Sequence, residues 1–99
     1  MEMKQIKKAL LQEKIRITEQ AKKRMKKRGY TNSDIISCIW GGELTKIQLF
    51  MNRVCVFLEG KDMDGLPIIL VVGEDNLDPN QLEIVSVIPP INKNFKCVI

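Results

Sequence analysis

The chain has 99 residues, a length that fits one domain (1–99), and its apolar content of 44% is enough for a core of its own. No apolar run approaches the ~20 residues that a membrane-spanning helix needs, and the basic N-terminus lacks the apolar stretch of a signal peptide. Histidine is absent, which excludes a Cys–His nucleophile and argues against zinc, so no metal and no cofactor are expected.

Charge is distributed very unevenly along the chain. Residues 1–30 hold eleven Lys and Arg against three Glu, a balance of +8, whereas residues 31–99 hold five basic residues against nine acidic ones, a balance of −4. A folded domain with one basic pole attracts polyanions, of which nucleic acid is the commonest, and it could equally dock an acidic protein. The composition therefore keeps RNA, DNA and a protein partner open.

The three cysteines form no CxxC pair. Cys38 and Cys55 stand inside apolar segments, which favours buried free thiols over disulfides or metal ligands. Free thiols are typical of the cytoplasm, which is the compartment we expect.

The first predicted helix covers residues 3–12, where Met3, Ile6 and Ala9 recur at helical spacing with lysines between them. Residues 14–17 are expected to form a short extended link. The next segment, Ile17–Tyr30, predicts a second helix. Its signals are a Thr18 N-cap, helix formers throughout and Gly29 in the position that follows a C-terminus.

The faces of this second helix carry the functional prediction. Ala21 and Met25 form a narrow apolar edge, too thin for a fully buried helix. Gln20, Arg24 and Arg28 follow one another at intervals of four along its border. The remaining faces carry lysines, which usually serve only solvation but here are candidate RNA contacts: Lys22, Lys23, Lys26 and Lys27. The two guanidinium groups could bind phosphate or pair with an internal acid.

A third helix is predicted from the Thr31 cap to Gly41-Gly42. Its broad apolar face, which includes Ile36 and Trp40, is expected to be core, although Trp40 could instead stack on a nucleic-acid base. Tyr30 lies between the helices and is the only tyrosine available for proton transfer.

From Glu43 onward the apolar period changes from 3.6 to 2. Strands are predicted at residues 44–51, 54–59, 66–73 and 82–88, joined by short connections, with a further tail strand conceivable at 95–99. Asp62-Met63-Asp64-Gly65 imitates a calcium loop, but its third ligand acid is missing, so a hairpin turn is expected. The resulting fold class is α+β: two to three N-terminal helices packed on a four-stranded antiparallel sheet. Because Ile68–Val72 is apolar at nearly every position, we expect both faces of the sheet to be covered.

Several of these residues form a pattern together. The run I17-T18-E19-Q20-A21-x-x-R24-M25-x-x-R28-G29-Y30, the capped helix ending in G41-G42-E43, V54–G60 and D64-G65-x-P67 stand in unbroken order. Over about residues 15–90 the chain resembles a small bacterial family of uncharacterised domains, written T-x-H-A-x-x-R-M-x-x-R-G-I at its start. That family is similar to the RelE and BrnT toxins, which implies a toxin-type ribonuclease fold that acts without metal and can be encoded beside an antitoxin.

The chain departs from the family pattern at the positions that would move protons. Gln20 stands where the family has its helical histidine, Ile69 where it has a strand histidine, and Ile88 where an aromatic residue is common. Arg24 and Arg28 remain and could stabilise phosphorane charge, with Tyr30 as a candidate proton carrier. The resemblance therefore implies an RNA-binding, toxin-like domain whose ribonuclease activity is weak or lost.

Two other functions remain open at this stage. One is a non-catalytic interaction module that binds an antitoxin-like protein or forms a homodimer through the apolar face of the sheet. The other is a DNA binder without sequence preference, which rests on charge alone.

Overall fold

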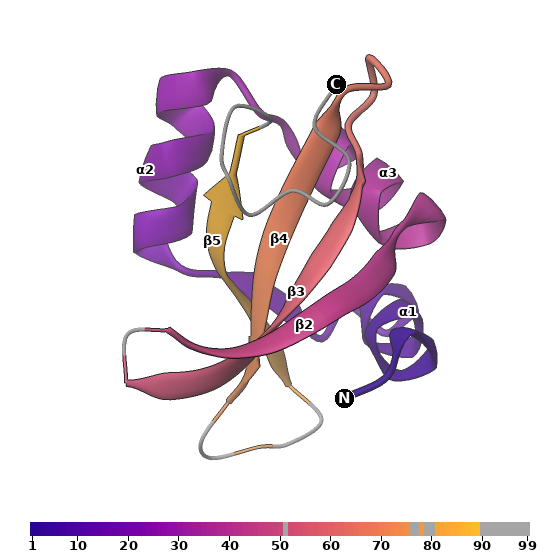
Figure 1. Ribbon diagram of the computed structural model, residues 1–99, viewed down its shortest axis with the longest axis vertical. Helices are drawn as coiled ribbons and strands as arrows, with labels where there is room; N and C mark the ends of the chain where they lie inside the picture. The colour runs from indigo at the N-terminus through magenta and orange to yellow at the C-terminus, as the bar shows by residue number, and fades with distance from the viewer. Residues whose placement is uncertain (51, 76–77, 79–80, 90–99) are drawn as a thin grey trace.

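The computed structural model describes residues 1–50, 52–75, 78 and 81–89, and shows an α+β fold of three helices and one sheet (Figure 1). The helices are α1 (Met3–Leu11), α2 (Glu19–Arg28) and α3 (Asn32–Gly41). The strands are β1 (Ile15–Ile17), β2 (Glu43–Phe50), β3 (Arg53–Lys61), β4 (Pro67–Glu74) and β5 (Leu82–Ile88). All three predicted helices and the four longer strands are confirmed.

The sheet differs from the prediction in strand number and in one pairing. It has five strands in the order β1-β5-β4-β3-β2, and β1 runs parallel to β5, with Ile15 opposite Leu82 and Ile17 opposite Ile84. The predicted four-stranded antiparallel sheet is therefore wrong, because the expected link at residues 14–17 contains an additional strand. Three residues are too few to show a period of 2, so the sequence carries no strand signal there. The conceivable tail strand at 95–99 lies outside the described residues.

The start of α3 is tied to the turn between β3 and β4. Thr31 and Asp34 form a capping box, in which the Asp34 carboxylate accepts from the backbone N–H of Thr31 at 2.9 Å. The other Asp34 oxygen accepts from the N–H of Met63, also at 2.9 Å. In the turn itself, Asp62 Oδ1 accepts from the N–H groups of Asp64 and Leu66. The predicted hairpin turn is confirmed, since this carboxylate is occupied by backbone donors.

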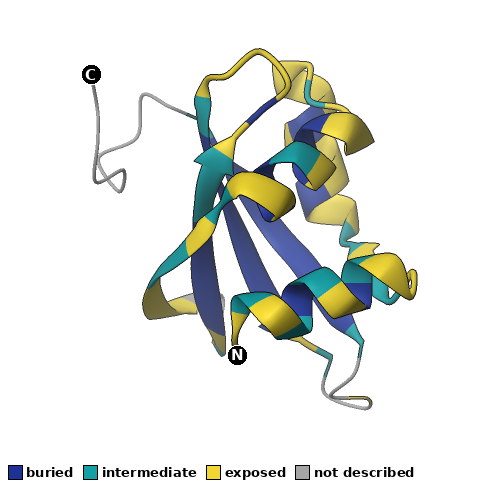
Figure 2. Ribbon diagram, turned by 90° about the vertical axis from the view of Figure 1, so that its right-hand side faces the viewer, coloured by how far each residue is buried: buried dark blue, intermediate teal, exposed yellow. Residues whose placement is uncertain are grey.

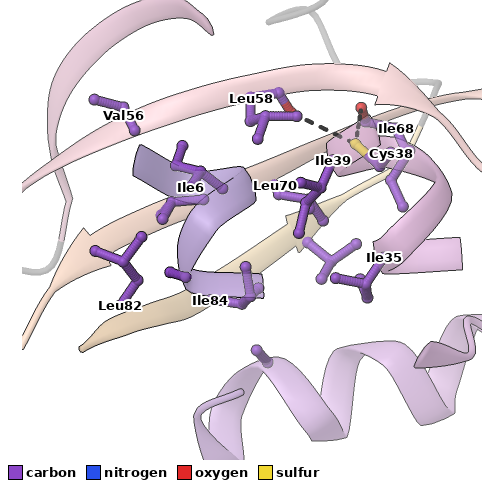
Figure 3. Packing of buried hydrophobic residues seen from close by; sticks show 14 of the residues in the cluster. Ile6, Ile35, Cys38, Ile39, Val56, Leu58, Ile68, Leu70, Leu82 and Ile84 are labelled. Atoms are coloured by element: carbon purple, nitrogen blue, oxygen red, sulfur yellow. Dashed lines mark hydrogen bonds between the residues drawn. The ribbon is translucent and has the colours of Figure 1, made fainter. Parts of the chain in front are cut away.

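The helices lie on one face of the sheet and enclose the larger hydrophobic cluster (Figure 2). Cys38 is a buried member of this cluster, and its thiol donates toward the carbonyls of Leu58 at 3.9 Å and Ile68 at 3.7 Å (Figure 3). Burial raises the pKa of the Cys38 thiol to about 12. Cys38 and Cys55 are both buried free thiols, as predicted.

The opposite face of the sheet carries a second, smaller cluster. Its members are at most 7% exposed: Cys55, Phe57, Ile69, Val71, Val85 and Ile88. Residues of β4 therefore alternate between two buried environments, which confirms the expectation drawn from the run Ile68–Val72.

The apolar face of α3 is only partly buried, contrary to the expectation that it is core. Ile35, Cys38 and Ile39 are buried, but Ile36 is 43% and Trp40 is 46% exposed. One side of the helix suffices to fill the space above β3, so residues on the next side remain at the surface. The Trp40 ring is covered in part by the Lys7 ammonium, 5.6 Å from its centroid.

Candidate nucleic-acid interface

Helix α2 begins and ends where its sequence predicts. The Thr18 hydroxyl accepts from the N–H of Ala21 at 3.2 Å, and Gly29 adopts the left-handed conformation with φ of 77°. Ala21 and Met25 are its two buried residues, with exposures of 0% and 6%, and they join the larger cluster beside β5. The helix is thus attached along one narrow edge, and its other positions face outward.

All six cationic side chains of α2 are exposed: Lys22, Lys23, Arg24, Lys26, Lys27 and Arg28. We call them the α2 cationic face. The ion pair found on the helix joins Lys22 to Glu19 at 3.5 Å, between two side chains that are both largely exposed. In the part of the chain that the structure describes, neither Arg24 nor Arg28 forms an ion pair. Their guanidinium groups are therefore not neutralised by an internal acid.

Gln20, Arg24 and Arg28 form one stripe along α2, because residues four apart lie on the same side of a helix. All three are exposed, so the stripe lies in solvent rather than at the core boundary where the sequence placed it. The structure thus brings the two predicted arginines together on an open surface.

Tyr30 follows α2 and is half-buried against the larger cluster. Burial, together with the negative charge of Asp62, raises the pKa of its phenol, an effect that the nearby Arg28 guanidinium partly opposes. The phenol is therefore neutral at pH 7 and could donate a proton but not remove one. The two acids beside it, Asp34 and Asp62, are occupied by backbone hydrogen bonds.

The family that this sequence resembles has histidines at two positions, and in this chain those positions lie on opposite sides of the sheet. Gln20 is on the solvent side of α2, whereas Ile69 is completely buried in the smaller cluster on the other face. An amide and an aliphatic side chain do not transfer protons near neutral pH. Neither position can therefore supply the general base that the resemblance implies there.

A charged cluster that the sequence analysis missed lies beside the start of α2. The Glu83 carboxylate, whose side chain is 8% exposed, accepts from Arg16 Nε at 3.1 Å and from Arg53 Nη1 at 2.9 Å. Burial alone would raise the pKa of Glu83, but the bonds and charges of both arginines outweigh it and the pKa is lowered. One signal could have revealed this cluster, since a lone acid in the apolar strand Leu82–Ile88 requires a cationic partner.

Two of the larger hollows of the surface lie away from the cationic face. One of about 440 Å³ opens between α1, β1 and α3 and is lined by Leu10, Ile15 and Ile35 among others. Another, of about 660 Å³, lies between the end of α3 and the Glu59–Lys61 segment. Neither is lined by α2. A smaller hollow of about 300 Å³ is lined by Glu19 and Lys22 of α2 together with Arg16 and Glu83.

Within the described ranges, no three His, Cys, Asp or Glu side chains are grouped so that they could hold a metal ion. Nor is any helix there long and apolar enough to cross a membrane. Searches against protein-family models, curated proteins and solved structures find no match to this chain.

Proposed function

We propose that this domain binds RNA through the α2 cationic face, with Arg24 and Arg28 as the principal phosphate contacts and Gln20 as a neighbouring hydrogen-bonding group. The observation that supports it is the set of six exposed cations on one helix, of which Lys22 alone is paired with an acid of that helix. Guanidinium groups that are free of internal partners can each form a bidentate pair with a phosphate.

The dimensions of α2 suit such a ligand. Ten residues of helix extend for about 15 Å, enough to follow several consecutive phosphates of a nucleic-acid strand. Because four of the six cations of this face are lysines, binding is expected to be electrostatic and weakly selective in sequence.

Cleavage by this surface is expected to be weak or lost. Arg24 and Arg28 could stabilise charge on a phosphorane, and Tyr30 could donate a proton, but Gln20 and Ile69, at the two histidine positions of the family, cannot activate the 2′-hydroxyl. Absence of one general acid or base typically lowers the rate 10²–10⁴-fold. The proposal is therefore an RNA-binding domain of the toxin type with impaired metal-independent ribonuclease activity.

Fluorescence anisotropy with a labelled single-stranded RNA tests the binding. Affinity should fall steeply between 50 and 200 mM salt, because each phosphate contact contributes about −0.7 to the slope of log K against log salt. The double variant Arg24→Gln/Arg28→Gln should weaken binding at least about tenfold and make the salt slope shallower by about 1.4.

The matched control is Lys4→Gln/Lys8→Gln, which removes the same charge from exposed positions of α1. It should change affinity much less than the arginine variant does. Equal losses in the two variants would mean that only net charge matters, and an affinity that does not respond to salt would overturn the proposal.

Ribonuclease activity is measured separately by incubating the protein with RNA in EDTA and analysing the product ends. Residual activity should yield 2′,3′-cyclic phosphate ends at a low rate and disappear in Arg24→Gln/Arg28→Gln. Cleavage that persists in this variant would place any active centre elsewhere in the molecule.

The second candidate function, a module that binds another protein or itself, has one observation in its favour. Large apolar side chains are exposed together on the hairpin of β2 and β3. Their position, at the opposite edge of the sheet from α2, would permit both functions in one domain.

A further inference from the structure

The two edges of the sheet differ in how well they are protected. Edge strand β1 has only three residues and leads directly into α2. Edge strand β2, Glu43–Phe50, has eight residues, contains no proline, and carries only Glu43 and Lys46 as charges. Among the described strands it pairs with β3 alone, so its outer backbone groups face away from the sheet. A long edge with few charges is a template for another strand.

Exposed apolar side chains lie on this same hairpin. Ile47 is 72%, Leu49 is 67% and Val54 is 69% exposed, and we call these three residues the hairpin patch. Leu49 lies directly opposite Val54, and Ile47 lies opposite Val56, a member of the larger cluster. The patch therefore continues the helix-covered face of the sheet beyond the helices. Three adjacent residues of this kind on one face are typical of an interaction site rather than of scattered surface residues.

We propose that β2 pairs antiparallel with β2 of a second copy of this chain, so that the two five-stranded sheets form one continuous sheet about a twofold axis. Such an interface is isologous, and each strand must therefore be compatible with itself. An axis at Lys46 would set two ammonium groups opposite each other, which is unfavourable. An axis at Ile47 instead sets Ile47 against its own copy, with Lys46 opposite Gln48 and Leu49 opposite Thr45. This register overlaps residues 44–50 and opposes no like charges.

The charge distribution favours a second copy at the β2 edge over one at α2, whose ten residues carry six cations and one acid. The chain carries a net charge of +4, concentrated in residues 1–30, so two copies repel each other where their basic helices approach. Helix α2 packs on β5, at the far side of the sheet from β2 (Figure 1). Residues 43–59 carry two acids and two bases, so the hairpin of β2 and β3 itself has no net charge, although Met1 lines the same hollow as Ile47 and Val54. Pairing there keeps the two α2 cationic faces at the outer ends of the joined sheet.

Sedimentation equilibrium between about 1 and 200 μM tests the assembly. The wild-type protein should approach twice its 11.4 kDa mass as the concentration rises. The variant Ile47→Lys/Leu49→Lys should stay monomeric over the whole range, because it places four ammonium groups in the joint. Since both positions are exposed, its circular dichroism and melting temperature should match those of the wild type when both are compared at about 1 μM, at the low end of the range, where association contributes least to stability. The matched control is Leu11→Lys/Met63→Lys, which changes apolar residues that are 70% and 65% exposed elsewhere and should still dimerise.

The register is tested by oxidation of single cysteine variants in a Cys97→Ser background, in which Cys38 and Cys55 are buried. Ile47→Cys should form an interchain disulfide readily, because the axis brings the two copies of residue 47 face to face, whereas Leu11→Cys should not. A wild-type monomer at 200 μM, or a dimer that survives in Ile47→Lys/Leu49→Lys, overturns the proposal. RNA binding is measured separately, by the anisotropy assay described above. The proposed dimer and the proposed RNA binding can therefore fail independently.

Discussion

Arg53 and Glu83 are joined across an intervening strand. Arg53 belongs to β3 and Glu83 to β5, yet Arg53 Nη1 donates to Glu83 Oε1 at 2.9 Å because the guanidinium passes over Gly73 of β4. On the other side of Glu83, Arg16 of β1 donates to the second carboxylate oxygen. One carboxylate thus links side chains from both sides of β5, including the short parallel strand that the sequence did not reveal.

Removing the charge of Glu83 should destabilise the fold. Glu83→Gln keeps the size of the side chain but leaves Arg53, which is only 26% exposed, without its anion, so the free energy of unfolding at pH 7 should fall by about 1–2 kcal/mol. The pKa of Glu83 is lowered in the folded state, so its stabilisation is present above the ordinary value of 4.5 and is lost as the pH falls through the folded pKa. Urea unfolding at pH 7 and pH 3 should therefore show a difference from wild type that shrinks in acid. Glu74→Gln, at an exposed position, is the control, and an equal effect at both pH values would contradict the assignment.

A side chain at position 73 should destabilise the protein when Arg53 is present. A Cβ at position 73 would lie 2.8 Å from Arg53 Nη2 and 2.9 Å from Arg53 Nε, so Gly73→Ala must push the guanidinium away from Glu83. We expect a loss of about 1–2 kcal/mol in the free energy of unfolding. In an Arg53→Met background the same substitution should cost much less, and a double-mutant cycle measures the difference. Additive effects would show that the two residues are not coupled.

The Asp34 capping box should make stability depend on pH. Backbone hydrogen bonds from Met63 and Thr31 hold the pKa of Asp34 below its ordinary value of 3.8. Its contribution is present above that value and disappears as the pH falls through the folded pKa. Asp34→Asn should lower the free energy of unfolding by about 1–2 kcal/mol at pH 7 and by little at pH 3. Denaturant titrations at the two pH values check this, and Asp64→Asn, in an exposed turn position, should have little effect at either.

Adjacent residues of α2 should respond very differently to truncation. Met25→Ala opens a cavity beneath the helix and should lower the free energy of unfolding by about 2–3 kcal/mol. Arg24→Ala removes an exposed side chain and should change it by no more than about 0.5 kcal/mol. Thermal unfolding followed by circular dichroism compares the two. A large loss in Arg24→Ala would mean that this arginine has a structural partner.

The Cys38 thiol should be inert in the native protein. Its pKa of about 12 leaves a thiolate fraction of only about 10⁻⁴ at pH 8, and its exposure is 0%. Iodoacetamide at pH 8 should therefore leave the Cys38 peptide unmodified until guanidinium is added, as mass spectrometry of the digest can show. Modification of the native protein at the rate of an exposed thiol would contradict this burial.

The sequence predicted the parts of the fold that rest on local signals. The Thr18 and Thr31 caps, Gly29 and the switch of apolar period at Glu43 located all three helices and the four longer strands. Strand β1 was missed because three residues between two helices have no period, and its pairing with β5 depends on a contact 67 residues apart in the chain. The same reason explains why the Arg16–Glu83–Arg53 cluster was missed.

The sequence could predict which residues form the candidate site, but not how far each of them is exposed to solvent. Helical spacing located Gln20, Arg24 and Arg28 on one stripe, and the structure confirms that they share it. These side chains lie in solvent, free of internal acids. Their exposure depends on how α2 packs on β5, and no local sequence pattern encodes that packing. The positions of Gln20 and Ile69 on opposite faces could not be seen either, because they follow from how the whole sheet is placed between its two clusters.

The narrow attachment of α2 has an evolutionary consequence. Two of its ten positions, Ala21 and Met25, meet the interior, so most of the helix can change sequence without a penalty in folding. A lineage could exchange its cations for acids, or place an imidazole at position 20, by single steps that each leave a viable protein. The outer residues of the helix can thus be exchanged without loss of the fold, and the helix is also the natural site at which to engineer a new ligand preference.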